Sequence, residues 1–366
     1  MRILWDASNH TMYPIAGEGL TSGTVQMVRN IAAGLADRGH TVHVIAPDLE
    51  QEEQWGPNLW YWPASYHPTK ADVAIQLMHV NPEPGYDADM LVLATFGCDP
   101  FLGPEHEWAA QVDAFPVFCA KHAELLQKLR PTIKPEQCHY TGLGIDLAEY
   151  RQATDEVKIP GRIMYANDPA RGLFYVLDIF DKLRQRVPDA TLHVGYDFDR
   201  GLKSRAWEHS QMAQLLWECK RRIEQTPGVA NLGAVSRKRI VYEQASCQVH
   251  VMPSDPPNVG TQIWGMTQME CAAAGAALVL SDVEAFPEVF GEGATILPVV
   301  GRFHPAIERR IDAADYAEVV AELMTDGDKW KAESKRAREL AAKNTWSEVA
   351  RRWDEMLGAL KGANVG

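Results

Sequence analysis

One segment in the C-terminal third of the chain combines glycines, an acid and small residues in an order that suits a phosphate-bearing ligand. Gly260 and Gly265 bracket a loop that can approach a ligand closely, because glycine has no side chain to obstruct it. Residues 266–274 are expected to form a helix that Gly275 ends, so its N-terminus would point backbone N–H groups at an anion. The carboxylate of Glu270, inside this helix, could accept two hydroxyls of a ribose diol. A solvated helix acid is the alternative.

Two other turns could bring positive potential to an anion. Arg171 lies at the expected start of a helix, and arginine can hold a phosphate through two parallel hydrogen bonds. An exposed arginine at a helix start is the alternative. Gly17 and Gly19 belong to a glycine-rich turn ahead of a helix, where backbone N–H groups can approach an anion. A plain turn is the alternative here, and the spacing over residues 17–23 misses the dinucleotide fingerprint by one residue.

Candidate side chains for acid, base or metal chemistry are few. His79 follows the apolar run 73–77 and is either structural or placed to contact a substrate, and Asp99 is a weaker candidate at another strand end. Nothing resembles a Ser-His-Asp triad or a cluster of metal ligands. We therefore expect chemistry without a cofactor or a metal, in which helix dipoles and cations supply the positive potential.

The composition is typical of globular proteins, with 46% hydrophobic and 23% charged residues, and 366 residues are enough for two domains. A formal net charge of −13 opposes extensive binding to nucleic acid or anionic lipid. We find no transmembrane segment of roughly 18 apolar residues and no signal-peptide pattern, and so expect a cytoplasmic protein. The 6 cysteines lack Cys-x2-Cys spacing, which predicts small buried thiols.

Apolar runs of strand length alternate with amphipathic stretches, which predicts an α/β fold with doubly wound parallel sheets. The elements expected in the first half are strands over 1–5, 41–46, 73–77, 90–94 and 115–119 and helices over 24–38 and 120–129. Those expected in the second half are strands over 162–166 and 191–194, a helix over 173–186 and one long helix over 314–344. The glycines and polar stretch of residues 142–161 predict a boundary between two domains that face a central cleft.

Residues 262–270, Gln-Ile-Trp-Gly-Met-Thr-Gln-Met-Glu, resemble the acid-x7-acid region of retaining, nucleotide-sugar-dependent glycosyltransferases of the GT-B fold. The chain is similar to glycosyltransferase family 4, the glycosyl transferases group 1. The spacing, the aromatic Trp264, Gly265 and the second acid Glu270 all match, whereas Gln262 stands where the family has its first acid. In the family the first acid contacts the donor sugar and the second contacts the ribose, so nucleotide binding carries over better than sugar handling.

The resemblance extends over the whole chain. Residues 35–45 match the end of the family's first helix and the strand after it, residues 143–146 match its junction turn with the asparagine replaced, and residues 345–353 match its closing helix. It implies a Rossmann-like acceptor-binding domain over 1–150, a Rossmann-like nucleotide-sugar-binding domain over 161–344, and a return helix over 345–366 that packs on the first domain.

The resemblance also assigns roles to single residues. Arg171 with Gly172 matches the second of two cations that face the donor diphosphate, while the first falls on Ala166, and Val235 matches a residue whose backbone lies against the base. The run 236–239 could add positive charge or be a solvated surface. The implied donor site is Gly17, Gly19, Asn167, Arg171, Val235, Gln262, Trp264, Gly265, Met266 and Glu270, with catalytic roles for His79, Arg171 and Gln262.

The implied activity is transfer of a sugar from a nucleoside diphosphate sugar, with UDP or GDP as the nucleotide, to a hydroxyl of a glycan, lipid or small molecule, with retention of configuration. Gln262 cannot attack as a carboxylate would, so a front-face process suits these residues. A nucleotide-sugar epimerase or hydrolase on the same fold, and a catalytically weak nucleotide-sugar-binding protein, stay open as alternatives. The tryptophan-rich residues 54–62 are either an aromatic sugar platform or a packed core edge.

Overall fold

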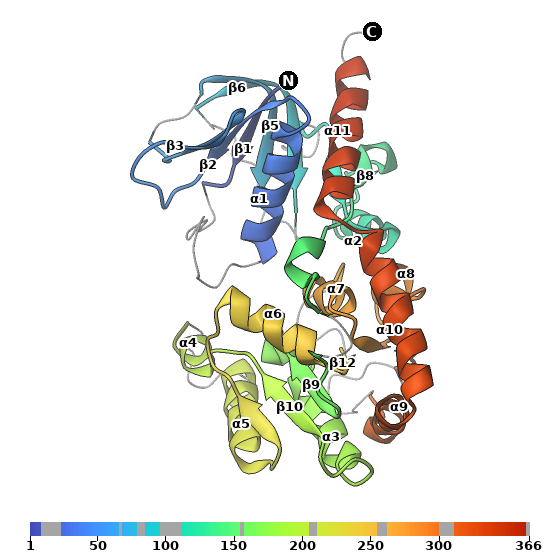
Figure 1. The fold of residues 1–366 in the computed structure, drawn as a ribbon. Coiled ribbons are helices and arrows are strands. Elements are labelled where there is room, and N and C mark those ends of the chain that lie inside the picture. The colour runs from blue at the N-terminus through green and yellow to red at the C-terminus, as the bar shows by residue number, and fades with distance from the viewer. Residues whose placement is uncertain are drawn as a thin grey trace. The chain divides into compact units, whose positions relative to one another are not determined.

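The computed structural model describes residues 1–8, 23–65, 68–78, 85–95, 111–153, 157–204, 211–254, 262–299 and 311–363. The chain divides into two compact units. Unit 1 consists of Met1–Gly144 with Asn344–Gly366, and unit 2 consists of Ile145–Lys343. Figure 1 labels the helices and strands of both units.

Unit 1 is built on a six-stranded sheet whose strands follow the order β3-β4-β2-β1-β5-β6. The strands are β1 (Arg2–Asp6), β2 (Thr41–Ile45), β3 (Glu53–Gly56), β4 (Leu59–Trp62), β5 (Lys70–Leu77) and β6 (Asp87–Ala94). All neighbours pair in parallel except β3 with β4, which are antiparallel at the edge. Ile3, Leu4 and Trp5 of β1 are almost completely buried, as expected for a central strand of a parallel sheet.

The remaining elements of unit 1 are helices, a 3-10 turn and two further short strands, which pair in parallel as a separate two-stranded sheet. They are helix α1 (Gly23–Ala36), strand β7 (Phe115–Val117), helix α2 (Ala120–Leu129), the 3-10 turn η1 (Pro135–Gln137), strand β8 (Cys138–Tyr140) and helix α11 (Trp346–Ala363). The strand expected over 115–119 ends earlier, at Val117. The reason is that the Phe118 N–H donates to Nδ1 of His122, at 3.2 Å, so the chain turns into α2.

The tryptophan-rich segment forms the antiparallel edge hairpin β3–β4, and its side chains alternate between two faces. Leu59 and Tyr61 are buried in the core. Trp60 and Trp62 are half-buried on the other face, where the ring of His43 stacks on Trp60 and accepts a hydrogen bond of 2.8 Å from the Trp62 indole. The segment is therefore a packed edge on one face, while the other face presents a row of aromatic rings.

Helix α11 packs along α1, and these two helices approach each other closely (Figure 1). The approach depends on Gly34, because a Cβ built there would lie 2.4 Å from the Cβ of Ala350. The rings of Trp5 and Trp353 lie 5.3 Å apart, and a Cβ on Gly144 would lie 2.6 Å from the backbone of Trp346. The C-terminal helix thus belongs to the N-terminal unit, which confirms that the chain returns to it.

We expect Gly34→Ala to lower the free energy of unfolding by about 1–3 kcal/mol, because the new methyl group overpacks the contact with Ala350. Chemical denaturation measures this change. Gly358→Ala is the matched control in α11, since a Cβ there meets nothing within 4 Å, and it should leave stability unchanged or raise it by up to about 1 kcal/mol. The double variant Gly34→Ala/Ala350→Gly should recover most of the loss; equal stabilities of Gly34→Ala and wild type would contradict the close contact.

Unit 2 is built on a second six-stranded sheet, in which every pairing is parallel, with the order β11-β10-β9-β12-β13-β14. The strands are β9 (Arg162–Tyr165), β10 (Thr191–Val194), β11 (Val229–Asn231), β12 (Val249–Met252), β13 (Ala277–Ser281) and β14 (Thr295–Leu297). The chain runs from β9 outward to β11 and then returns to place β12 beside β9. The expected α/β class with two doubly wound units is confirmed.

The helices and 3-10 turns of unit 2 are η2 (Leu147–Tyr150), η4 (Pro169–Arg171), α3 (Leu173–Leu183), α4 (Phe198–Ser204), α5 (Gln211–Gln225), α6 (Arg237–Ser246), α7 (Met266–Ala273), α8 (Phe286–Phe290), α9 (Ala313–Thr325) and α10 (Gly327–Ala342).

The prediction of a single long helix over 314–344 was wrong, because two helices, α9 and α10, cover this range. Asp326 has an extended backbone and its carboxylate accepts from the N–H groups of Asp328 and Lys329, so one helix ends and a capped helix begins.

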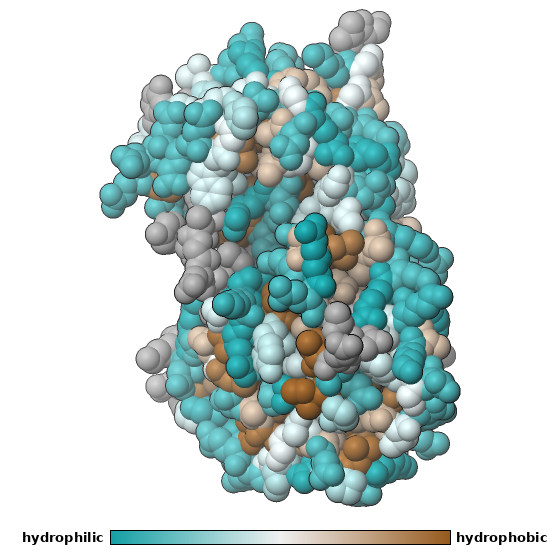
Figure 2. Space-filling view, in the orientation of Figure 1, coloured by the Kyte–Doolittle hydropathy of each residue, from teal (hydrophilic) through white to brown (hydrophobic). Residues whose placement is uncertain are grey.

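The surface shown in Figure 2 is mostly hydrophilic, and hydrophobic residues gather there only in small separate patches. Of the helices in the described part of the chain, none combines the length and the apolar character needed to span a membrane. Cys119, Cys219, Cys247 and Cys271 are buried free thiols and Cys138 is partly buried, in line with the cysteine pattern. Cys98 lies outside the described residues.

Strand β12 carries a fully buried histidine, His250, whose Nδ1–H donates to the carbonyl oxygen of Met164 at 3.1 Å. Among the described residues, its Nε2 has no hydrogen-bond partner. Burial lowers the pKa of His250 from 6.5 to about 4, although the hydrogen bond to Met164 opposes this shift. Unfolding therefore takes up a proton between these two pH values, and the folded state is stabilised above pH 6.5 and loses that stabilisation as the pH falls towards 4.

We expect His250→Gln to weaken the pH dependence of stability on the acid side. Between about pH 7.5 and about pH 4.5 the wild type should lose about 2–3 kcal/mol through this histidine alone, in addition to the loss from its carboxylates. Chemical denaturation of both proteins at the two pH values gives the difference. Parallel curves for variant and wild type would show that His250 is not the group that titrates.

Candidate functional site

The two central strands of unit 2, β9 and β12, form the point at which the strand order reverses. In doubly wound sheets the loops after the carboxyl ends of these strands diverge and leave room for a ligand. Asn167 follows β9, and its side-chain amide lies 3.6 Å from the sulfur of Met252, the last residue of β12. Asp168 accepts from the Ala170 N–H at 3.0 Å and caps the turn η4. This cap aligns the turn that carries Arg171.

Gly172 brings this turn against the end of β12. Its φ of +123° belongs to a region that favours glycine, and a Cβ there would lie 2.7 Å from the carbonyl oxygen of Pro253. Any other residue would push the start of α3 away from β12. The glycine therefore allows the preceding arginine to reach the residues after β12.

Arg171 and Gln262 meet at this edge of the sheet. Nη1 of Arg171 donates to Oε1 of Gln262 at 3.2 Å, and Nε2 of Gln262 donates to the hydroxyl of Ser254 at 3.2 Å. Gln262 is 4% exposed, and both ends of its amide are hydrogen-bonded inside unit 2. The backbone N–H of Gln262 donates to the carboxylate of Glu284. The arginine, the amide and this carboxylate are thus connected in one chain of hydrogen bonds.

Helix α7 begins beside this cluster, four residues after Gln262. Its N-cap Gly265 has a φ of +154° and no side-chain cap, and a Cβ there would lie 2.7 Å from Oε1 of Gln268. Trp264 is buried, and Met266 opens the helix. Free first-turn N–H groups at a helix N-terminus attract anions. The expected helix and its end at Gly275, which has a φ of +77°, are confirmed.

Val235 lies near the ends of the neighbouring strands β9 and β10. A Cβ on Gly195, the residue after β10, would lie 3.6 Å from Cγ2 of Val235 and 3.9 Å from the Cβ of Ala166. The hydroxyl of Ser236 accepts from the Arg239 N–H at 3.3 Å and so caps α6. Val235 therefore stands at the same carboxyl edge of the sheet as Asn167 and lies two residues before the start of α6.

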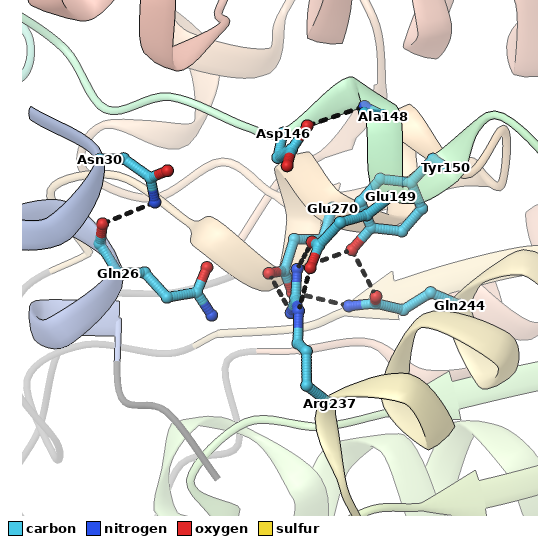
Figure 3. A network of polar contacts seen from close by, with 9 residues as sticks. All are labelled: Gln26, Asn30, Asp146, Ala148, Glu149, Tyr150, Arg237, Gln244 and Glu270. Carbon is cyan, nitrogen blue, oxygen red and sulfur yellow. Dashed lines mark hydrogen bonds and ion pairs between the residues drawn. The ribbon is translucent and has the colours of Figure 1, made fainter. Parts of the chain in front are cut away.

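Glu270 is buried on α7 and is held by two side chains from α6 (Figure 3). Its Oε1 lies 2.6 Å from Nη1 of Arg237, and its Oε2 accepts from the Gln244 amide at 2.7 Å. Arg237 also pairs with Glu149, and Gln244 accepts from the Tyr150 hydroxyl at 2.7 Å. One guanidinium is thus shared by two carboxylates, one from α7 and one from η2.

The surroundings of this network keep the phenol of Tyr150 neutral and the guanidinium of Arg237 ionised. Burial, followed by the negative charge of Glu270, raises the pKa of Tyr150 well above its ordinary value, so the phenol stays a neutral donor. Burial alone would lower the pKa of Arg237, but the hydrogen bond to Glu149 and the charge of Glu270 outweigh it and raise the pKa. The side chain of Arg237 is 20% exposed. The network therefore holds a permanent cation beside Glu270.

Sequence reasoning missed the role of Arg237. For residues 236–239 the sequence left two interpretations, added positive charge at the site and a solvated surface. The structure shows that the residues of this run differ in their surroundings. Lys238 and Arg239 are exposed, whereas Arg237 turns towards Glu270. Ser254, Gln244 and Glu284 carried no sequence signal, because nothing in their local pattern distinguishes them from other polar residues.

Three expected site residues, Gly17, Gly19 and His79, lie outside the described residues, as do Asp99 and Gly260. Within the described ranges, no group of three or more His, Cys, Asp or Glu side chains is arranged to hold a metal ion. The described part of the expected donor site lies in unit 2, where Arg171 touches Gln262 and Glu270 touches Arg237.

We expect Arg237→Leu to lower the free energy of unfolding by about 3 kcal/mol, because Glu270 then becomes a buried charge that has lost its cation. Lys238→Leu is the matched control on the same helix turn and should change stability little, since Lys238 is exposed. The double variant Arg237→Leu/Glu270→Gln should recover part of the loss. Chemical denaturation checks all three, and equal stabilities of the Arg237 and Lys238 variants would refute the buried pairing.

Solved structures of several known proteins superpose on this chain at low sequence identity. No protein-family model matches it, and a sequence search of curated proteins found no match. Sucrose-phosphate synthase from Thermosynechococcus elongatus superposes with a TM-score of 0.72 at 13% identity, over 99% of both chains. A UDP-forming α,α-trehalose-phosphate synthase from Burkholderia xenovorans reaches 0.66 at 12% identity, also over 99% of both chains.

The catalytic domain of starch synthase IV from Arabidopsis thaliana, bound to ADP and acarbose, gives a TM-score of 0.65 at 11% identity over 98% of this chain and 99% of that one. At such low identities the likeness establishes the fold alone. The chain therefore shares the GT-B fold with these enzymes, as the resemblance in sequence had implied. Membership of glycosyltransferase family 4 stays a prediction.

Proposed function

We propose that the protein is a glycosyltransferase that takes a sugar from a nucleoside diphosphate sugar and transfers it to an acceptor hydroxyl. The observation that carries this proposal is the contact between Arg171 and Gln262 at the reversal point of the unit 2 sheet, beside the uncapped start of α7. The glycosyltransferase names of the structural neighbours support it, and so does the match of residues 262–270 to the family's motif. Departure of a nucleoside diphosphate needs fixed positive potential, and both the arginine and the helix start provide it.

In this proposal the nucleotide lies along the carboxyl edge of the unit 2 sheet. Arg171 and the first N–H groups of α7 hold the diphosphate, Trp264, Gly265 and Met266 shape the loop that approaches it, and Val235 and Asn167 lie towards the base. Glu270 accepts the ribose hydroxyls. Each of its oxygens already receives one hydrogen bond, from Arg237 and Gln244, and a carboxylate oxygen has a second lone pair to offer.

Transfer with retention of configuration follows most simply from a front-face process. The neutral amide of Gln262 cannot form a covalent glycosyl ester, and both of its ends are hydrogen-bonded. The bond between the sugar carbon and the phosphate oxygen breaks while the acceptor oxygen bonds to the same face of that carbon. The acceptor's proton passes to the departing phosphate oxygen, whose charge Arg171 stabilises. Protein groups stabilise the charge of the departing diphosphate, so the proposal needs no cofactor.

A panel of UDP, GDP and ADP sugars tests the proposal by thermal shift, followed by an assay for release of nucleoside diphosphate with and without candidate acceptors. We expect at least one donor to raise the melting temperature and to be turned over only when an acceptor is present. Release without an acceptor would instead indicate a hydrolase, and binding without release would indicate a nucleotide-sugar-binding protein. If no donor binds, the proposal fails.

We expect Glu270→Ala to weaken binding of the nucleoside diphosphate about tenfold or more, because the ribose loses its carboxylate acceptor. Isothermal titration calorimetry measures this, with circular dichroism to verify that the variant is folded. Glu224→Ala, an exposed acid on α5, is the matched control. Unchanged affinity of a folded Glu270→Ala protein would remove the role assigned to this residue.

A further inference from the structure

The turn after β13 contains a residue in an unfavourable backbone conformation. Glu284 has a φ of +46°, which lies in the left-handed region that residues other than glycine rarely adopt. Among the described residues, only Met78 shares this property without being glycine. Such backbone conformations persist where surrounding contacts enforce them, and they concentrate at sites that bind ligands. The contacts of Glu284 show which part of the molecule enforces this one.

Two hydrogen bonds of opposite direction connect Gln262 with Glu284 and the residue after it. Its Oε2 accepts from the Gln262 backbone N–H, and the N–H of the next residue, Ala285, donates to the Gln262 carbonyl oxygen at 3.1 Å. The hydroxyl of Ser281, at the end of β13, donates to the Ser254 carbonyl oxygen at 2.7 Å. The turn is therefore tied to the residues that follow β12, and its carboxylate lies at the backbone of the residue that contacts Arg171.

This arrangement places a negative charge where the side chain of Gln262 has none. A carboxylate accepts hydrogen bonds only, and it offers several lone pairs, whereas the Gln262 amide is already engaged at both ends. Sugar hydroxyls are hydrogen-bond donors, and a sugar carbon that is losing a phosphate becomes electron-poor. Glu284 is half-buried, so a ligand can reach it. A carboxylate in this position can accept hydrogen bonds from the sugar hydroxyls and stabilise the positive charge on the sugar carbon.

We propose that Glu284 binds the sugar of the donor: its carboxylate accepts hydrogen bonds from the sugar hydroxyls and faces the positive charge that develops on the sugar. This inference rests on the proposed function, and it assigns the sugar to a residue 22 positions after Gln262 in the chain. Arg171 then binds the diphosphate on one side of Gln262, and Glu284 binds the sugar on the other. The alternative is that Glu284 only fastens the turn to Gln262.

The experiment compares two ligands that share one base: the nucleotide sugar that stabilises the wild type most, and the corresponding nucleoside diphosphate without the sugar. Their dissociation constants are measured by calorimetry for wild type, Glu284→Gln, Glu284→Gly and the control Asp282→Asn, which changes an exposed acid in the same turn. Turnover gives kcat and KM for the same four proteins. Glycine accepts the positive φ, so Glu284→Gly removes the carboxylate without demanding the unfavourable backbone from a side chain.

We expect both Glu284 variants to bind the nucleotide sugar about tenfold or more weakly, to lose kcat/KM to at least the same extent, and to bind the nucleoside diphosphate within about twofold of wild type. Asp282→Asn should resemble wild type with both ligands. Equal weakening for both ligands would show that Glu284 only fastens the turn, and wild-type affinity of Glu284→Gln for the nucleotide sugar would also overturn the inference. These outcomes leave the proposed function intact, whereas a wild type that binds neither ligand overturns both.

Discussion

The close approach of Gly172 to the carbonyl oxygen of Pro253 is the constraint on which the candidate site depends. It allows the chain after β9 to touch the chain after β12, at the one edge of the unit 2 sheet where the strand order reverses. Arg171 then reaches Gln262, and Gln262 in turn reaches Ser254 and Glu284. A side chain at position 172 would separate these loops, because its Cβ would meet the main chain of Pro253, which cannot rotate away as a flexible side chain would.

A second constraint is the balance of charge around Arg237. Two carboxylates, from η2 and α7, share this guanidinium, and Gln244 satisfies the remaining oxygen of Glu270. A buried acid is tolerated only when it is paired and hydrogen-bonded, so Glu270 depends on α6 for its place in the core. The same pairing fixes the orientation of the carboxylate before any ligand arrives. The pairing contributes to the stability of unit 2, and in the proposed function the same oriented carboxylate is the acceptor for the ribose hydroxyls.

Local patterns accounted for most of the elements and failed where capping decided a boundary. The strand over 191–194 and the helix over 120–129 were predicted with their observed limits, because their periodicity and their ends are both encoded locally. The helix over 314–344 was wrong, because the Asp326 carboxylate caps a new helix inside an otherwise continuous helical pattern. The strand over 115–119 ended early, because His122 takes the N–H that a longer strand would have used. In both cases hydrogen bonds between one side chain and the backbone outweighed the pattern.

The sequence by itself determined the α/β class, the glycine turns, the acid inside α7 and the arginine before Gly172, since these depend on residue type and short-range spacing. Only the tertiary structure decided which polar groups meet. Arg171 and Gln262 are separated by 91 residues, and Arg237 and Glu270 by 33, so no local pattern could pair them. The same holds for Glu284, which looks like any other turn acid in the sequence. Its carboxylate lies beside Gln262 because β12 and β13 are neighbours in the sheet, and the loops after parallel strands end at a common edge.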